Sequence, residues 1–304
     1  MNSTIEINLP EAVSEESLAA FVQILPFETL SFSAKRKTDA FSGPWLLFWV
    51  IEGTPSAQSI LDGLNSALAL MNIPTIQACA LTITPLSADT NWLEANYQPF
   101  ESFRADQFFI HGADYEGEIP AGLIPLKIDA SIAFGSGEHG TTHGCLLLMQ
   151  HIHKEGFTPS HILDMGCGSG ILAVAAVKLW PVPTLAVDIE DDAKILTLQH
   201  AALNHVTDYI TAAVGDGYKA GEVQTKVAQN KPFDLVIANI LALPLKAMAP
   251  DMIPCLAPGG YLILSGMLHA QADSVIAVHD ALGLELLERL EIGDWTSLLY
   301  KKPA

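Results

Sequence analysis

One short segment constrains the fold of this 304-residue chain more than any other. Between an apolar stretch, His161–Met165, and a helix-forming stretch, Ser169–Leu179, residues 164–170 read Asp-Met-Gly-Cys-Gly-Ser-Gly. Glycines that follow a strand permit a tight turn and the close approach of a ligand to the backbone, and the next helix presents free N–H groups at its N-terminus. The segment therefore predicts the ligand-binding turn of a doubly wound α/β domain.

Strand-like and helix-like stretches alternate around this turn, which indicates right-handed crossovers and a parallel sheet. The last two strands are joined through Gly293-Asp294, a hairpin signal that adds one antiparallel strand. We expect residues 131–304 to form a mostly parallel sheet with a terminal antiparallel hairpin. The expected strands are His161–Met165, Thr184–Ile189, Ile210–Val214, Phe233–Ile240, Tyr261–Ser265, Leu284–Leu290 and Thr296–Tyr300, and the expected helices are Ser169–Leu179, Asp191–Asn204, Ala242–Cys255 and Ala270–Ala281.

The first ninety residues show a different order, β-α-β-β-α-β, which is typical of a small ferredoxin-like α+β domain. Residues 91–130 contain only two short strand-like pieces, Gln107–Ile110 and Leu123–Ile128, and we expect them to form a connector. The elements expected in the first domain are the strands Ile5–Leu9, Phe27–Ala34, Trp45–Ile51 and Ile76–Pro85 and the helices Ser14–Leu25 and Ser56–Met71.

Composition narrows the class of protein. Half of the residues are hydrophobic and 16% are charged, which predicts a folded chain with a sizeable core. The apolar runs are too short to span a bilayer, and residues 1–6 lack the pattern of a signal peptide, so we expect a cytoplasmic protein. The four cysteines show no paired spacing, and the histidines between His139 and His153 do not follow His-Glu-x-x-His, so we expect neither disulfides nor a bound metal.

The formal net charge is −19. Such a surface repels nucleic acid and anionic membranes and attracts basic partners. Solubility alone is the simpler explanation for this acidity. We therefore expect no direct contact with nucleic acid or membrane, and charge alone does not name a partner.

The ligand of the glycine turn can be narrowed by elimination. A nicotinamide fingerprint, Gly-x-Gly-x-x-Gly, starting at Gly166 would need glycine where Ile171 stands, and no Gly-Lys-Ser/Thr of a P-loop follows. Asp-x-Gly-x-Gly-x-Gly suits S-adenosylmethionine, whose charged amino-acid end can meet the acid while its carboxylate meets backbone N–H groups. The predicted cofactor-binding residues here are Asp164, Gly166 and Gly168.

Two further acids follow the next strands. Asp188 ends the second strand of the domain, where an acid can accept hydrogen bonds from both ribose hydroxyls of an adenosine-type ligand. Asp216 follows the third strand, where an acid can bond the adenine amino group. The alternative is that both aspartates only stabilise turns or cap helices.

Asn239 follows the fourth strand in the sequence Asn-Ile-Leu-Ala, at an end of the sheet shared with the glycine turn. Amino-group methyltransferases hold the acceptor nitrogen at this place with an asparagine and a neighbouring backbone carbonyl, usually within Asn-Pro-Pro-aromatic. The alternative is an asparagine that caps the helix Ala242–Cys255.

Four stretches together carry a more specific signal: residues 134–142 (Phe-Gly-Ser-Gly-Glu-His-Gly-Thr-Thr), 162–179, 238–244, and 264–267 with 271–272. They resemble the methyltransferase family that modifies large-subunit ribosomal protein eleven, over roughly residues 91 to 304. In that family the first stretch reads Phe-Gly-Thr-Gly-Thr-His-Pro-Thr-Thr. Here Glu138 and Gly140 replace threonine and proline, so we expect this loop to be more flexible and more negative.

The resemblance implies a class I S-adenosylmethionine-dependent protein methyltransferase. It implies that Thr142, Gly166, Asp188 and Asn239 contact the cofactor, and that Asn239 also lies near the acceptor amine as the catalytic residue. The acceptors would be lysine and N-terminal amines of a basic ribosomal protein held by the first domain, residues 1–90. Independently of the resemblance, we favour a monomer. Alternatives are a methyltransferase that acts on another protein or a small molecule, or a non-catalytic cofactor-binding protein.

Overall fold

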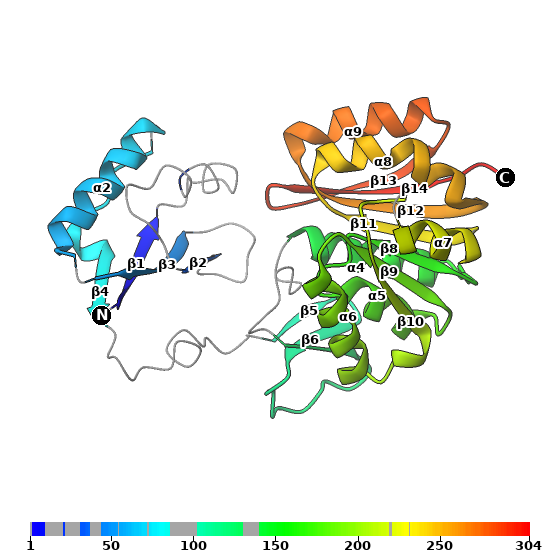
Figure 1. The fold of residues 1–304 in the computed structure, drawn as a ribbon, viewed down its shortest axis with the longest axis horizontal. Coiled ribbons are helices and arrows are strands. Elements are labelled where there is room, and N and C mark those ends of the chain that lie inside the picture. The colour runs from blue at the N-terminus through cyan, green and yellow to red at the C-terminus, as the bar shows by residue number, and fades with distance from the viewer. Residues whose placement is uncertain are drawn as a thin grey trace. The chain divides into compact units, whose positions relative to one another are not determined.

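The computed structural model describes residues 2–9, 21, 31–36, 44–53, 55–71, 73–85, 102–129, 140–218, 221–230 and 232–304 (Figure 1). The chain divides into two compact units, Met1–Tyr97 and Gln98–Ala304, and each has its own core. Apart from Phe21, the predicted helix Ser14–Leu25 lies outside the described residues, as do residues 130–139 of the predicted loop. None of the helices within the described ranges is long and apolar enough to cross a bilayer.

The first unit contains a four-stranded antiparallel sheet in the order β2-β3-β1-β4. Strands β1 and β2 run in the same direction on either side of β3, and β3 and β4 run in the same direction on either side of β1. This is the split arrangement that the sequence predicts. Along β1, Ile5, Ile7 and Leu9 are buried and alternate with partly exposed residues, so one face of the sheet packs on the helix. The elements are β1 (Asn2–Leu9), β2 (Ser31–Arg36), β3 (Trp45–Glu52), α2 (Ala57–Leu70), η1 (Ala78–Ala80) and β4 (Leu81–Pro85).

The second unit is built on a seven-stranded sheet in the order β10-β9-β8-β11-β12-β14-β13. Strands β8 to β12 are parallel, and β14 runs antiparallel to both of its neighbours, which confirms the predicted hairpin. The strand order reverses between β8 and β11, so the crevice at the carboxyl ends of these two strands is where such sheets bind ligands. The strands are β8 (Ile162–Met165), β9 (Thr184–Asp188), β10 (Ile210–Val214), β11 (Phe233–Asn239), β12 (Leu256–Leu268), β13 (Glu285–Ile292) and β14 (Trp295–Lys301).

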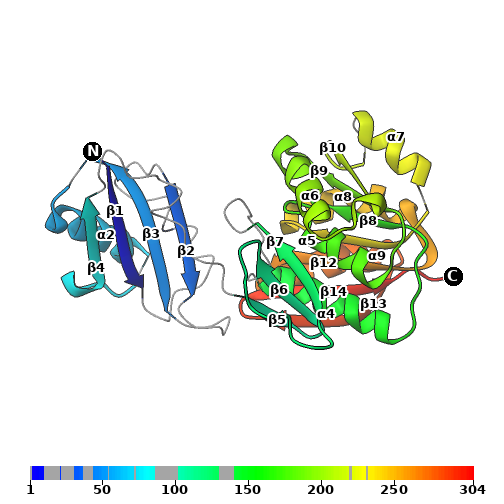
Figure 2. The ribbon, with the colours of Figure 1, turned by 90° about the horizontal axis from the view of Figure 1, so that it is seen from below.

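Helices cover both faces of this sheet (Figures 1 and 2). Consecutive strand residues enter opposite cores: Ile162 packs with α4 and α5, whereas Leu163 packs with α7, α8 and α9. Both faces are therefore apolar, as a doubly wound parallel sheet requires. The helices are α4 (Gly140–Lys154), α5 (Ile171–Leu179), α6 (Asp191–Leu203), α7 (Gly221–Asn230), α8 (Ala242–Met252) and α9 (His269–Ala281).

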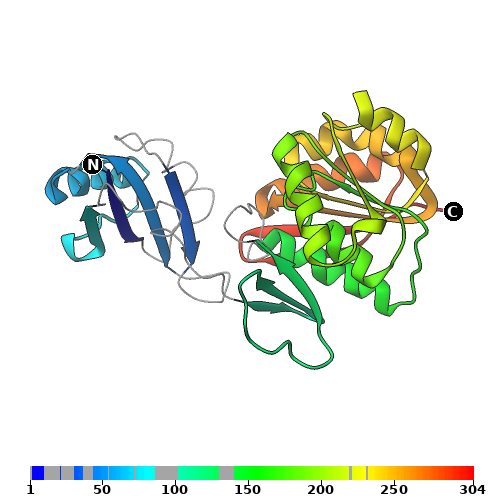
Figure 3. The ribbon, with the colours of Figure 1, turned by 60° about the horizontal axis from the view of Figure 1, so that its bottom comes forward.

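Residues 102–129, predicted as part of a connector, form a three-stranded sheet within the second unit (Figure 3). Its strands are β5 (Phe103–Ala105), β6 (Phe108–Gly112) and β7 (Ile124–Ile128). Gln150 of α4 is fully buried and bonds the backbone of this small sheet. The Gln150 Oε1 accepts from the Gln107 N–H at 2.6 Å, and the Gln150 Nε2 donates to the Ala105 carbonyl at 3.0 Å. This part of the connector is thus fixed to the domain of the seven-stranded sheet.

Two helices of the second unit, α4 and α7, are absent from the sequence prediction. Helix α4 opens with Gly140 and Thr141 and contains Gly144, residue types with weak helix propensity, so local sequence does not reveal it. Burial of its apolar residues stabilises it instead. In α7 the apolar signal is limited to Val223 and Val227, a buried pair at the i,i+4 spacing of one helix face.

Candidate active site

The glycine turn lies between β8 and α5 and bends over the end of β9. The backbone N–H groups of Gly166 and Cys167 both donate to the Val187 carbonyl, at 2.7 and 3.0 Å. Gly166, Gly168 and Gly170 have φ values of +75°, +51° and +75°, in the left-handed region that favours glycine. The tight turn predicted from the sequence is therefore present, and each of its three glycines is required by the backbone.

Helix α6 supports this turn from one side. Thr197 donates to the Gly168 carbonyl at 3.3 Å, and a Cβ on Gly170 would lie 2.8 Å from the Thr197 Cα. The Nδ1 of His200, one helical turn further on, is 2.6 Å from the Ser169 carbonyl oxygen. Thr197 and His200 were not predicted from the sequence, where their signal is a three-residue spacing on a predicted helix.

His200 also reaches beyond the turn. Its Nε2 accepts a hydrogen bond from the Asp129 N–H at 2.8 Å, so the proton of the neutral ring is on Nδ1, which donates to Ser169. The ring is fully buried, and burial lowers its pKa. Neutral His200 therefore connects the glycine turn to the residue that follows β7.

Asp164, the first residue of the motif, is completely buried at the end of β8. Its Oδ2 accepts from the Ala173 N–H at 3.0 Å, and within the described part of the chain its Oδ1 has no hydrogen-bond partner. Burial raises the pKa of the carboxyl to about 7, with a smaller contribution from the charge of Asp188. An unsatisfied buried acceptor is costly, so this atom is suited to receive a donor from a bound ligand.

The two other predicted acids differ in their surroundings. Asp188 is half-buried, and both of its oxygens accept backbone bonds: Oδ2 from the Gly168 N–H at 2.8 Å and Oδ1 from the Glu190 N–H at 3.1 Å. The carboxylate thus fixes the glycine turn and keeps lone pairs for further donors. Asp216 follows β10 and is exposed.

Asn239 and Thr142, which lie 97 positions apart, are in contact. The Asn239 Nδ2 donates to the Thr142 Oγ1 at 3.3 Å. Thr142 is buried in the first turn of α4, and Asn239 is half-buried at the carboxyl end of β11. Helix α8 has Leu241 at its N-cap and no side-chain capping bond, so Asn239 does not have the capping role that was its alternative explanation.

A sequence model of the ribosomal protein L11 methyltransferase family matches residues 56–303. The chain belongs to this family. Its relatives include the ribosomal protein L11 methyltransferases of Rhodopseudomonas palustris (strain BisB5), 38% identical over 80% of each chain, and of Bradyrhizobium diazoefficiens, 40% identical over 70% of each chain. A crystal structure of ribosomal protein L11 methylase from Lactobacillus delbrueckii subsp. bulgaricus has a TM-score of 0.59 and 25% identity, and it covers 67% of this chain and 100% of that chain.

Family membership confirms the resemblance noted in the sequence, and it makes the protein an S-adenosylmethionine-dependent methyltransferase. Within the described ranges, no group of His, Cys, Asp and Glu side chains forms a metal site. The cysteines are free; Cys79 is exposed, whereas Cys145, Cys167 and Cys255 are buried.

Gly140, where the family usually has proline, is a close-contact position. A Cβ there would lie 2.8 Å from the Ile292 carbonyl oxygen, and one on Gly144 would lie 2.2 Å from the Ser297 Oγ. These two glycines let the start of α4, and with it Thr142, approach the β13–β14 hairpin. Because Gly140 is buried in the first turn of α4, the predicted flexibility does not extend to this residue.

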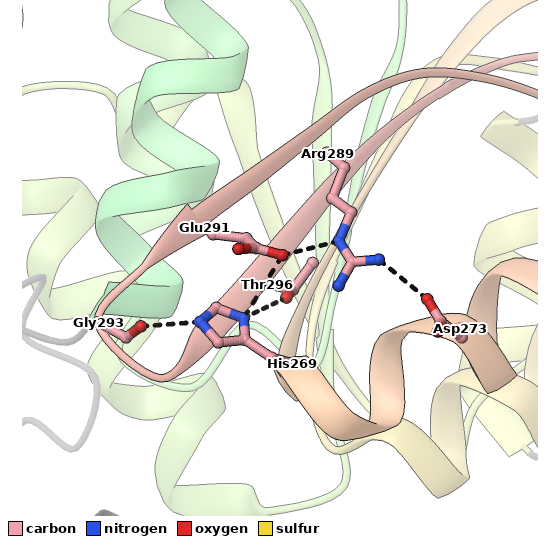
Figure 4. Close-up of polar contacts among 6 residues, drawn as sticks. All are labelled: His269, Asp273, Arg289, Glu291, Gly293 and Thr296. Atoms are coloured by element: carbon pink, nitrogen blue, oxygen red, sulfur yellow. Dashed lines mark hydrogen bonds and ion pairs between the residues drawn. The ribbon is translucent and has the colours of Figure 1, made fainter.

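Polar contacts hold the hairpin on α9 (Figure 4). The two ring nitrogens of His269 lie 2.7 Å from the Thr296 Oγ1 and 2.8 Å from the Gly293 carbonyl oxygen. Arg289 donates to Asp273 and Glu291, at 2.9 Å in each case. The hairpin that receives α4 is thus connected to the helix that follows β12.

Proposed function

We propose that this protein transfers methyl groups from S-adenosylmethionine to lysine and N-terminal amines of ribosomal protein L11. Its relatives carry the name ribosomal protein L11 methyltransferase. The observation that supports an amine acceptor most directly is that the Asn239 side chain bonds Thr142 and does not cap helix α8. This side chain lies at the end of β11, the strand next to β8 with its glycine turn.

The residues of the turn fit the amino-acid end of the donor. The Oδ1 of Asp164, which has no hydrogen-bond partner among the described residues, would accept from the ammonium group of the donor. The backbone at Gly166 and Gly168 would allow the close approach of the donor. Asp188 would bind the ribose hydroxyls, Asp216 the adenine amino group, and Thr142 would complete the site. The bound donor supplies a sulfonium methyl group that is open to in-line attack.

On the acceptor side, Asn239 would position the amine. Its Nδ2 already donates to Thr142, so Oδ1 is the atom of the amide that would accept an N–H of the amine. Such alignment of donor and acceptor can lower the barrier by roughly 7–11 kcal/mol at best. The amine must be neutral to react, and desolvation near a positive sulfonium lowers its pKa from about 10.4 for a lysine.

We assign the ribosomal protein to the first domain, residues 1–90, and the donor to residues 131–304. The net charge of −19 supports a basic substrate protein. We place the reaction in the cytoplasm, where ribosomal proteins are made and assembled, with a monomeric enzyme that has no direct contact with nucleic acid.

The test is transfer of a tritiated methyl group from labelled donor to purified ribosomal protein L11. Wild-type enzyme should label the protein, and mass mapping should place the label on lysine and N-terminal amines. In Asn239→Ala we expect kcat to fall by about 100-fold or more, because the acceptor loses its alignment. Thermal unfolding of this variant should match the wild type, since Asn239 is half-buried and its bond to Thr142 is long, at 3.3 Å.

Two results would contradict the proposal. Full activity of Asn239→Ala would remove the asparagine from the catalytic role. Labelling of another protein or of a small molecule, with L11 unlabelled, would support the alternative substrates instead.

A further inference from the structure

Ile240, the residue after Asn239, lies between two glycines, Gly166 in the turn after β8 and Gly266 in β12. On one side its Cγ2 occupies the place of a side chain on Gly166, because a Cβ there would be only 2.1 Å away. On the other side its backbone lies against Gly266 of β12, where a Cβ would be 2.3 Å from the Ile240 carbonyl oxygen and 2.8 Å from its nitrogen. The Ile240 N–H also donates to the Ser265 carbonyl at 3.2 Å.

The two contacts differ in kind. At Gly166 the neighbour is a methyl group at the end of a side chain, which can move by rotation. At Gly266 the neighbour is the peptide of Ile240 itself, which cannot yield without moving the backbone next to Asn239. Gly266 has a φ of +87°, so the chain also needs glycine there for its conformation.

We propose that Ile240, seated between Gly166 and Gly266, is a positioning residue that sets the spacing between the donor turn and the acceptor-binding Asn239. This inference rests on the proposed function. Ile240 shares a peptide bond with Asn239 and contacts the first glycine of the donor turn, so it connects the two halves of the site. Reacting atoms must lie about 3–3.5 Å apart, and an error of about 1 Å can lower the rate about 100-fold.

The first experiment compares Gly266→Ala with Gly283→Ala. Both glycines have a φ of +87°, but among the described residues a Cβ on Gly283 meets nothing within 4 Å, so the left-handed φ is matched and the contact with Ile240 differs. We expect kcat with L11 to fall about 30- to 100-fold in Gly266→Ala and less than about 2-fold in Gly283→Ala, because the methyl group displaces the Ile240 peptide by nearly 1 Å. Donor Kd, measured by calorimetry, should stay within about 3-fold in both variants. Equal kcat values in the two variants would overturn the proposal.

A second pair covers the case in which Gly266→Ala does not fold. Ile240→Val keeps both γ carbons on Cβ, including the Cγ2 methyl group that contacts Gly166, whereas Ile240→Ala removes that contact. We expect Val to retain kcat within about 2-fold and Ala to lose about 10-fold, with KM for L11 unchanged in both, because alignment and not substrate affinity is affected. The same kcat in Ile240→Ala and Ile240→Val would contradict the positioning role of Ile240.

A measurement without acceptor separates this inference from the proposed function. Calorimetric titration with donor alone should show Kd about 3- to 5-fold weaker for Ile240→Ala than for Ile240→Val, since the glycine turn loses a packing neighbour. If wild-type enzyme fails to label L11 but this difference in Kd is found, the substrate assignment is wrong and the positioning role of Ile240 is supported. If wild-type enzyme labels L11 and neither pair of variants differs in kcat or donor Kd, Ile240 has no positioning role and the proposed function is retained.

Discussion

The segments that follow β8 and β11, two neighbouring strands of one sheet, are built in opposite ways. The turn after β8 is held by backbone bonds to Val187, by Asp188 and by helix α6, and its aspartate is fully buried. At the end of β11, the Asn239 side chain donates to the Thr142 Oγ1 at a long 3.3 Å, and Leu241 and Leu243 are 69% and 73% exposed. A fixed backbone suits a small donor of constant shape, whereas an open segment leaves room for a protein substrate.

From this difference we expect substitutions at the β8 turn to reduce stability and donor binding, whereas those after β11 should reduce mainly turnover. The largest effect is expected for Gly170→Ala, because a Cβ there meets the Thr197 backbone at 2.8 Å in addition to the strain of positive φ. We expect a loss of roughly 3–4 kcal/mol in the free energy of unfolding, from left-handed backbone strain plus overpacking. Urea unfolding measures it, and donor Kd should weaken as well.

Gly156→Ala is the matched control. Gly156 has a φ of +84°, but a Cβ there meets no atom of the described residues within 4 Å, so a backbone strain of about 1–2 kcal/mol should remain. Equal destabilisation by the two substitutions would mean that helix α6 does not constrain the turn.

The next effect is expected at His200, which supports the same turn. His200→Ala removes two buried hydrogen bonds and should lower the free energy of unfolding by about 2–3 kcal/mol at pH 7.5. Burial lowers the pKa of His200 in the folded protein below its ordinary value of 6.5. Below pH 6.5 the unfolded chain therefore binds a proton at His200 that the folded protein does not bind. Wild-type stability should therefore fall as pH falls below 6.5.

The variant should lose this contribution, so the difference in stability between wild type and His200→Ala should shrink between pH 7.5 and pH 5. His151→Ala serves as a control, because that side chain is 46% exposed and its loss should change stability by less than about 0.5 kcal/mol. A difference between wild type and His200→Ala that stays constant with pH would show that the ring is not held neutral.

The sequence predicts the parts of the fold and the site that depend on local signals, and it does not predict those that depend on contacts between distant elements. The strands of the seven-stranded sheet and the turn at 164–170 are visible in the sequence, because apolar runs and glycines are local signals. The support of the turn by Thr197 and His200 is not, since it depends on contacts between elements far apart in the chain. Thr142 was identified only through the family resemblance, because its helix begins with residues of weak helix propensity.

A smaller effect is expected for Asp164→Asn. Because the pKa of Asp164 is raised to about 7, the folded protein holds a proton that the unfolded chain releases near pH 3.8. The contribution of this proton to stability is complete below pH 3.8 and is lost as pH rises through about 7, and Asp164→Asn should not show this decline. Since the ionised carboxylate would bind the ammonium of the donor, wild-type affinity should rise about 10-fold from pH 6 to pH 8. Calorimetry should find weaker and pH-independent binding by the variant, and equal pH profiles would exclude Asp164 from donor binding.

The smallest effect should come from the hairpin network of Figure 4. Arg289, Asp273 and Glu291 side chains are 34%, 87% and 51% exposed, so solvent screens their ion pairs. Arg289→Ala should cost less than about 1 kcal/mol of unfolding free energy, and the loss should shrink further in 1 M salt. Donor Kd should not change, because the start of α4 contacts the hairpin through Gly140 and Ile292 and not through these charges. If Arg289→Ala weakened donor binding, the hairpin would be part of the rigid donor side, and the contrast between the two strand ends would have to include it.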